Sequence, residues 1–188
     1  DLCETHGLAA ILTGKGGDVA FFQTPTSAIV ADEIALRGMA GLMSPTAAVL
    51  ASRLRRSVWR VMRAGVRQAL RSAAPRPLVN PLLHPDVQAM TPPPHPWLTD
   101  LQGAPPAKRQ QIAGFLSNLN LSSPARRSEH ARLLHPALAT PVVEATLATP
   151  IPRLTGGGHD RLLARQAFAD RLPARLLARR SKGELGAY

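Results

Sequence analysis

Residues 8–18 read LAAILTGKGGD, an apolar run that stops at a glycine-rich turn. The run has little polarity on either face, which is typical of a strand buried on both faces. A glycine turn directly after such a strand is typical of α/β proteins, in which it leads from the strand into a helix. We therefore expect one buried strand near the N-terminus, in residues 8–13.

Helical patterns dominate the rest of the chain. Apolar residues recur at spacings of three and four, and a Ser44-Pro45 pair is typical of a helix start. We expect helices in part of 20–36 (broken near Pro25), in 44–72, 107–119, 126–134, 141–148, 159–169 and 173–178, with Gly156-Gly157-Gly158 as a turn. Ten prolines fall in residues 74–106 and predict an extended connector there.

Composition sets the class of protein. The chain has 188 residues, of which 45% are hydrophobic, enough for one domain with a core. No apolar run reaches the ~18 residues that span a bilayer. The single cysteine, Cys3, excludes an internal disulfide framework, and the six histidines are not spaced as a ligand set. We expect a cytoplasmic protein without a membrane span.

Positive charge is in excess, and one long stretch of the chain has no acidic residue to offset it. Lys+Arg 23 against Asp+Glu 12 gives a net charge of +11, and residues 34–85 hold nine arginines and no acidic residue. In the helix expected at 44–72, an apolar stripe lies opposite a row of arginines, namely Arg56, Arg60, Arg63, Arg67 and Arg71. This row is compatible with a solvated face, a phosphate or acidic-peptide contact, or a nucleic-acid or membrane contact.

Two segments have the residue types that phosphate chemistry needs. Backbone N–H groups of Gly14, Gly16 and Gly17 suit a phosphate, and the Asp18 carboxylate suits Mg²⁺ bound to phosphate oxygens. Near the C-terminus, Lys182 lies on a short glycine-bounded loop from which it can stabilise developing negative charge. The alternatives are a purely structural turn for the first segment and a cationic helix C-terminus for the second.

Four segments in order resemble the synthetase domain of the asparagine synthetase family. Residues 12–18 resemble its Ser-Gly-x-Gly-Gly/Ser-Asp turn, and residues 135–144 resemble its Pro-Phe-Leu-Asp segment with the helix that follows. Residues 157–165 are similar to its Gly-Gly-x-x-Lys-x-x-Leu-Arg helix, and residues 172–183 to its Leu-Pro-x-x-x-x-x-Arg-x-Lys-x-Gly ending. Residues 94–98 and the arginine-rich middle look most like homologues found with lasso peptides, which act as peptide-macrocyclising enzymes.

The resemblance implies a fold and an activity. Residues 1–188 would be the mostly α-helical C-terminal portion of an α/β synthetase domain of the adenine nucleotide alpha hydrolase-like, PP-loop ATPase type. The family's Ser-Gly-Gly-x-Asp-Ser pyrophosphate loop and its glutaminase domain are absent, and we expect them upstream of residue 1. The family adenylates a carboxylate with ATP and Mg²⁺, releases pyrophosphate and lets an amine attack. The fragment alone is expected to be inactive.

The same resemblance assigns residues and partners. Asp18 would hold Mg²⁺, Gly14, Gly16 and Gly17 would contact the nucleotide, and Lys182 would be catalytic. The supporting cations for ATP would be Arg161, Arg165 and Arg180. The substrate would be a peptide or amino-acid carboxylate, with a leader-peptide-processing protein as a partner, and nucleic acid is not expected.

Three departures from the family pattern bear on the substrate. Lys15 stands where asparagine-forming members have an acidic residue, Val19 replaces a Glu, and Ala139 replaces an Asp. They favour a lasso peptide macrolactam cyclase over a true asparagine synthase. Two alternatives stay open, namely a pseudo-synthetase, and a non-catalytic basic helical module that binds nucleic acid or an acidic peptide.

Overall fold

The computed structural model describes residues 5–70, 84, 86, 95–101, 103–120 and 131–178. Its elements, in chain order, are β1 (Ala10–Leu12), α2 (Gly17–Ala20), α3 (Ala28–Arg37), the 3₁₀ helix η1 (Gly38–Met43), α4 (Thr46–Leu54), α5 (Val58–Leu70), α7 (Pro96–Thr99), α8 (Pro106–Asn120), β2 (Arg132–Leu134), the 3₁₀ helix η2 (Pro136–Leu138), α10 (Thr140–Ala148), α11 (Ile151–Thr155), α12 (Leu162–Ala167) and α13 (Ala174–Leu177).

Helix α3 lies at the centre of the packing. Its residues 28–33 are all buried, and it contacts η1, α4, α5, α8 and α11. A helix that is apolar almost all round is buried on every side, and the first six residues of this one, AIVADE, fit that rule except for the carboxylates of Asp32 and Glu33. The core around it is formed by Phe22, Ala28, Ile29, Val30, Ala47, Leu50, Ala51, Val61, Ala107, Ile151 and Leu154.

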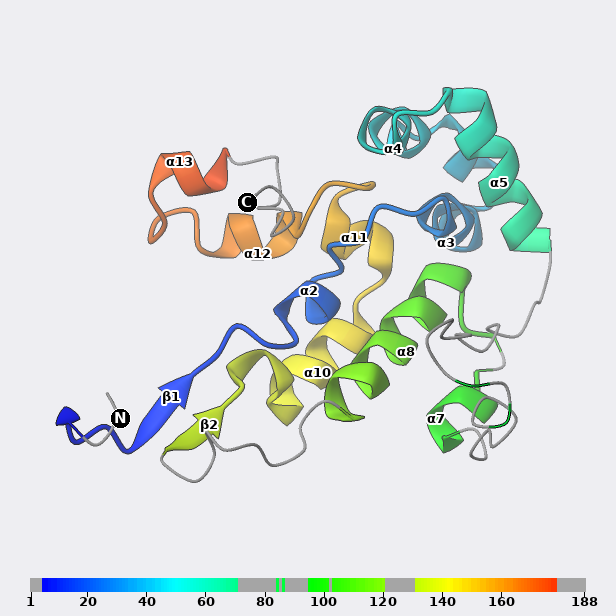
Figure 1. The fold of residues 1–188 in the computed structure, drawn as a ribbon. Helices are drawn as coiled ribbons and strands as arrows, with labels where there is room; N and C mark the ends of the chain where they lie inside the picture. Colours follow the sequence, from blue (N-terminus) through cyan, green and yellow to red (C-terminus); the bar gives the residue numbers. More distant parts are fainter. Residues whose placement is uncertain are drawn as a thin grey trace.

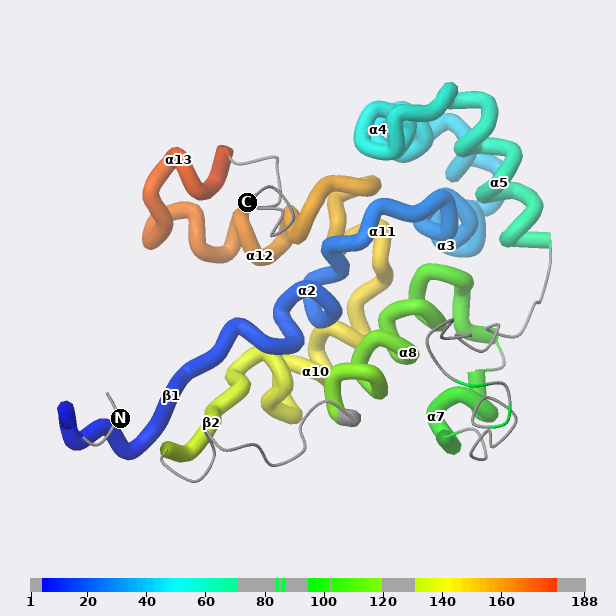
Figure 2. Tube along the Cα trace, in the orientation of Figure 1, coloured from blue at the N-terminus to red at the C-terminus, as the bar shows by residue number. Residues whose placement is uncertain are grey.

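The two strands pair in parallel at the opposite end of the molecule (Figure 1). In the register, Ala10 lies opposite Arg132 and Leu12 opposite Leu134. From this sheet the segments 10–37 and 132–155 run alongside each other towards α3, as the blue and yellow parts of Figure 2 show. The parallel pairing therefore sets the direction of both segments that reach the core.

A buried polar network joins four of the helices. The Asp32 carboxylate of α3 accepts hydrogen bonds from the N–H groups of Ala107 and Lys108 at 2.7 and 3.1 Å, and so caps α8. The Lys108 ammonium donates to Gln111 Oε1 at 2.6 Å and to two carbonyl oxygens, those of Thr146 and Thr149, at the end of α10. Burial lowers the pKa of Lys108 to about 8, although the charge of Asp32 opposes this.

Gln111 extends this network to the site helix. Its amide nitrogen donates to the carbonyl oxygens of Val19 and Ala20 at 3.2 and 2.9 Å, and its side chain is fully buried. Because these carbonyls end α2, the amide fixes the helix that carries Asp18 against α8. A buried amide whose donors and acceptor are all used contributes to a unique arrangement of its neighbours.

The structure confirms that a strand lies in residues 8–13, but the prediction that it is buried on both faces is wrong. The strand is present, but Leu12 is 72% exposed and both end residues of β1 lie on the surface. In the part of the chain that the structure describes, β1 pairs with one neighbour and no helix packs closely across it, so Leu12 faces solvent and Ile11 is only half-buried. A second strand, β2, lies where the pattern predicted the end of a helix at 126–134, and residues 126–130 fall outside the described residues.

The helix predicted at 44–72 is two helices. Arg55 ends α4 in the left-handed region, at φ 50°, and Ser57 then starts α5 with its hydroxyl accepting from the Arg60 N–H at 3.3 Å. The break lets α4 and α5 each turn an apolar stripe onto α3, which one straight helix could not do. Arg71 and Ser72 lie outside the described residues.

The other expected helices are largely confirmed. Helices α8 and α10 match the predictions at 107–119 and 141–148, and α13 lies within 173–178. The helix predicted at 159–169 is shorter, since α12 spans Leu162–Ala167, and the additional helix α11 ends at the glycine turn 156–158. In the predicted connector 74–106, α7 is a single short helix, and most of the other residues there lie outside the described ones.

No single helix among the described residues has the length and apolar character to cross a membrane. Taken together, residues 28–43 and 46–54 reach that length and apolar composition, but the two parts are bent by 96° relative to each other.

Replacing Asp32 with asparagine should remove one component of the pH dependence of stability. Burial raises the pKa of Asp32 from 3.8 to about 6, so the unfolded chain ionises before the folded protein does. The stability that this carboxyl contributes is present below pH 3.8 and is lost as the pH rises through 6, roughly 3 kcal/mol for such a shift. We therefore expect the difference in free energy of unfolding between the native protein and Asp32→Asn to fall by roughly 3 kcal/mol as the pH rises from 3.8 to 6.

Urea unfolding at pH 4, 5, 6 and 7 measures this difference. Asp100→Asn is the control, because Asp100 is exposed and its replacement should change the free energy of unfolding little at each pH. A difference between native protein and Asp32→Asn that is constant with pH would contradict the assignment.

Candidate functional site

The glycine turn and the His135-Pro136 segment meet at the carboxyl ends of the two parallel strands. Thr13 follows β1, and its N–H donates to the carbonyl oxygen of Leu134 at 2.9 Å. Its hydroxyl shares a hydrogen bond with Nδ1 of His135, which directly follows β2. Ligands of open α/β sheets bind at this edge, so the geometry marks these two turns as candidate site elements.

Gly16 packs directly on η2. Its φ is +84°, and a Cβ atom there would lie 2.3 Å from Cδ2 of Leu138. Both the backbone conformation and the close approach require glycine at this position. Within the same turn, the N–H of Gly17 donates to the carbonyl oxygen of Gly14 at 3.3 Å, and that of Lys15 to Thr13 Oγ1 at 3.3 Å. Two of the turn's amide groups are therefore used inside it.

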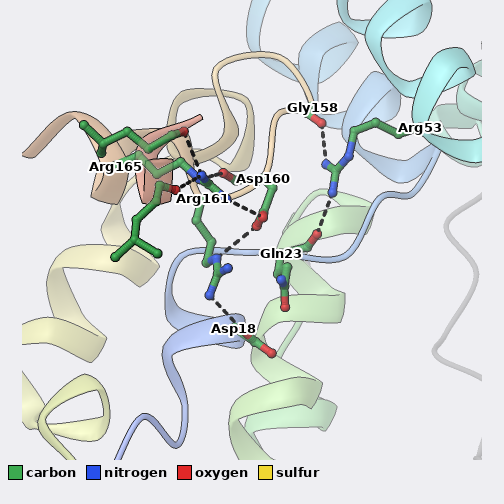
Figure 3. Close-up of polar contacts among 9 residues, drawn as sticks. Asp18, Gln23, Arg53, Gly158, Asp160, Arg161 and Arg165 are labelled. Atoms are coloured by element: carbon green, nitrogen blue, oxygen red, sulfur yellow. Dashed lines mark hydrogen bonds and ion pairs between the residues drawn. The ribbon is translucent and has the colours of Figure 1, made fainter. Parts of the chain in front are cut away.

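Asp18 follows this turn, in the first turn of α2, with its side chain 52% exposed. One carboxylate oxygen forms an ion pair with Nη1 of Arg161 at 3.2 Å (Figure 3). With its amide nitrogen towards Asp18, Gln23 donates to both carboxylate oxygens at 2.8 Å, and its amide oxygen accepts from Arg161 Nη2 at 3.3 Å. Asp18, Gln23 and Arg161 thus form one hydrogen-bonded cluster.

A chain of charges continues from this cluster. Nε of Arg161 donates to Asp160 Oδ1 at 3.0 Å, and Asp160 Oδ2 accepts from Nη2 of Arg165, also at 3.0 Å. The Asp160 side chain is 16% exposed and binds two arginines at once. Arg161 itself has φ 47°, which aims its side chain back towards α2. Asp160 therefore orients the guanidinium that meets Asp18.

Arg165 is placed beside the cluster, but it faces the C-terminal helix. Its Nη1 donates to the carbonyl oxygens of Leu176 and Leu177, both at 2.9 Å, and its Nε donates to the backbone oxygen of Asp160 at 3.0 Å. These bonds tie α12 to the end of α13. Leu177 lies five residues before Lys182 in the chain, so Arg165 positions the segment that leads to it.

Arg53 joins two segments of the site from the side of the core. Its Nη1 donates to the carbonyl oxygen of Gly158 at 2.6 Å and its Nη2 to that of Gln23 at 3.2 Å (Figure 3). Burial lowers the pKa of Arg53 below its usual value, and the nearby Asp160 carboxylate opposes that shift. One guanidinium therefore fixes the turn before Arg161 to the loop after α2.

The structure brings together five of the eight residues that the sequence nominated: Gly14, Gly16, Gly17, Asp18 and Arg161. Arg165 lies further along the charge chain, on the other side of Asp160, and Arg180 and Lys182 lie outside the described residues. Sequence reasoning missed Gln23, Arg53 and Asp160. Of these three, only Asp160 could have been nominated from its sequence context, because it is the carboxylate next to the glycine turn 156–158.

The surroundings of Asp18 suit a magnesium ion that is held mainly by phosphate oxygens. Asp18 is a single, half-exposed carboxylate, and the described residues contain no group of three carboxylate, histidine or cysteine ligands. Mg²⁺ in nucleotide sites is bound through one or two carboxylates together with substrate phosphates. Arg161 beside Asp18 adds a cation that can face a phosphate oxygen, so the chemistry of the two residues is compatible with a phosphate-bound Mg²⁺.

Replacing Arg53 with methionine should lower the free energy of unfolding by about 2–3 kcal/mol, because two carbonyl oxygens lose charged donors. Urea unfolding measures the change. Arg132→Met is the matched control, since Arg132 is exposed and forms no side-chain bond within the described residues. Equal effects of the two replacements would show that Arg53 does not join these segments.

Comparison with known proteins gave one match. The family model for asparagine synthase matches residues 2–187. The searches of curated proteins and of solved structures found no match. The match spans all four segments on which the resemblance depends.

Proposed function

Because the chain belongs to the asparagine synthase family, we propose that it carries part of the active site of an ATP-dependent ligase that forms amide bonds. Family membership indicates this general class of activity. The observation that supports the assignment to this site is the meeting of the four family-like segments. Thr13 bonds to His135, Asp18 to Arg161, and Arg165 to the carbonyls of Leu176 and Leu177.

The proposed reaction has two steps. A substrate carboxylate attacks the α-phosphate of ATP and forms an acyl-adenylate with release of pyrophosphate. An amine then attacks the acyl carbon, so that the amide forms and AMP leaves. The first step concentrates negative charge on the leaving pyrophosphate, and fixed cations that face this charge lower the barrier.

Each site residue has a proposed role in this reaction. Asp18 would hold Mg²⁺, which neutralises phosphate charge when it is bound. Arg161 is held by Asp160 and Gln23 next to Asp18, so it is the described cation best placed for a phosphate oxygen. Lys182, with Arg180 beside it, is proposed as the cation that stabilises the transition state, and Arg165 as the residue that positions this segment.

For the substrate we propose a carboxylate within a peptide, which makes the product a macrolactam of the lasso peptide type. The support is in the three departures from the family pattern. Val19, where asparagine-forming members have Glu, packs against Gly114 of α8, and Ala139 and Lys15 offer no carboxylate. A site without these acidic groups has fewer contacts for the free amino group of aspartate. A leader-peptide-processing partner and a cytoplasmic location stay predictions.

Replacing Asp18 with asparagine should lower the rate of pyrophosphate release about 100-fold at fixed Mg²⁺, because an amide binds the cation far more weakly than a carboxylate. The assay uses the protein at its natural length with ATP, Mg²⁺ and either aspartate with ammonia or a linear peptide that has a free N-terminus and an acidic side chain. Asp170→Asn is the control, since the Asp170 side chain is 77% exposed. Equal rates in the two variants would exclude the metal role of Asp18.

Replacing Lys182 with alanine should reduce kcat by about 10²–10³ with a small change in the KM for ATP, which is the pattern of an interaction made in the transition state. Mass spectrometry of the peptide product, which loses one water on cyclisation, separates macrolactam from asparagine formation. Full activity of Lys182→Ala would remove Lys182 from the site. No AMP release with either substrate would favour the pseudo-synthetase.

A further inference from the structure

Helix α5 presents a row of cations that the site does not use. Arg56, Arg60, Arg63 and Arg67, together with Trp59, line a surface hollow of about 500 Å³. We call these five residues the arginine face. Trp59 is 74% exposed, so an aromatic ring stands among the guanidinium groups.

None of the four arginines has an ion-pair partner in the described part of the chain. Arg60, Arg63 and Arg67 are neighbours on the surface of α5, at spacings of three and four residues, and like charges at these spacings destabilise a helix. Arg56 lies two residues before the helix begins. Residues 34–85 contain no carboxylate that could offset this repulsion. A negatively charged ligand bound at this face would therefore relieve the repulsion between its arginines.

Packing fixes the direction in which this face points. On the opposite side of α5, Val61 is 2% exposed, and Gly65 lies so close to Val30 that a Cβ atom would be 2.6 Å from its side chain. Gln68 Nε2 also donates to Ser27 Oγ at 2.8 Å. Helix α5 cannot roll inward, so the arginine face stays on the surface.

We propose that the arginine face binds an acidic peptide segment. Arg60 and Arg67 are seven positions apart, which is about 10 Å along α5, the length of about three extended peptide residues, and Arg56 extends the face beyond the start of the helix. Guanidinium groups bind carboxylates through paired hydrogen bonds, and a peptide with alternate acidic residues places one every ~7 Å. Trp59 supplies an apolar contact between these charged pairs.

The same observations disfavour the two other polyanions. A membrane-bound helix inserts its apolar stripe into the lipid, but the centre of this stripe in α5, at Val61 and Gly65, is buried, and Gly65 packs on Val30 of α3. Nucleic-acid affinity grows with the number of phosphates that a protein neutralises, and the four arginines of this face can neutralise only a few. A short acidic peptide is the ligand whose size matches the face.

The face begins next to the candidate site. Arg56 follows Arg53 by three residues, at most ~11 Å of chain, and Arg53 bonds to Gln23 and Gly158 of the site. A peptide bound along α5 can therefore extend towards Asp18. The binding itself does not depend on the ligase activity, and the test below uses neither ATP nor Mg²⁺.

The experiment measures the fluorescence anisotropy of labelled octaglutamate with the protein, at 50 and at 200 mM salt. We expect Arg56→Gln, Arg60→Gln, Arg63→Gln and Arg67→Gln together to weaken binding at least 10-fold, and Trp59→Ala alone to weaken it 3-fold or more. The control removes the same charge from exposed arginines elsewhere, with Arg132→Gln, Arg153→Gln, Arg171→Gln and Arg175→Gln, and should change binding less than 3-fold. Circular dichroism melting shows that both variants fold.

Three results would overturn the proposal. Equal weakening in the two quadruple variants would mean that only net charge attracts the peptide. Tighter binding of labelled octadeoxythymidylate, or of vesicles with 30% phosphatidylserine, with loss in the same α5 variant, would assign the face to that polyanion. No binding of octaglutamate at 50 mM salt would leave the face without this function. A ligase assay without product would affect none of these outcomes.

Discussion

The arrangement of the whole chain depends on one buried carboxylate. Asp32 lies in the centre of α3, a helix enclosed by the core, and it accepts the first N–H groups of α8. Since α8 starts on this group, its position sets Lys108, whose ammonium ends α10, and Gln111, whose amide ends α2. Asp32 thus fixes the relative positions of α8, α10 and α2, which come from distant parts of the sequence, and α2 carries Asp18.

Local sequence patterns were sufficient to predict several residues of the site, but not the long-range hydrogen bonds that join its segments. The turn at Gly16 and the carboxylate of Asp18 follow directly from the residues 12–18, and Arg161 follows from the similarity of residues 157–165 to a known helix. Arg53 could not be found in this way, because it bonds to backbone carbonyls of Gln23 and Gly158 that any residue type could supply. Long-range bonds to main-chain oxygens leave no trace in the sequence of their acceptors.

The errors in the predicted fold have the same origin. Residues 132–134 form a strand because β1 offers hydrogen bonds to them, although their own sequence, Arg-Leu-Leu, is favourable for a helix. The chain breaks at residues 55–57 because α4 and α5 both pack against α3. The sequence gives no sign of this break, since the arginine row continues through it. In both places tertiary contacts outweigh local propensity, whereas α8 and α10, whose patterns and packing agree, were predicted well.

The open sheet has a consequence for handling the protein. Within the residues that the structure describes, strand β1 is hydrogen-bonded to a neighbouring strand on one side only, and its Leu12 side chain is 72% exposed. A strand edge with free N–H and C=O groups next to apolar side chains is a template on which another strand can add. An additional strand can therefore join the sheet at this side of residues 10–12, and a charged side chain in place of Leu12 is the simplest means of disfavouring such an addition.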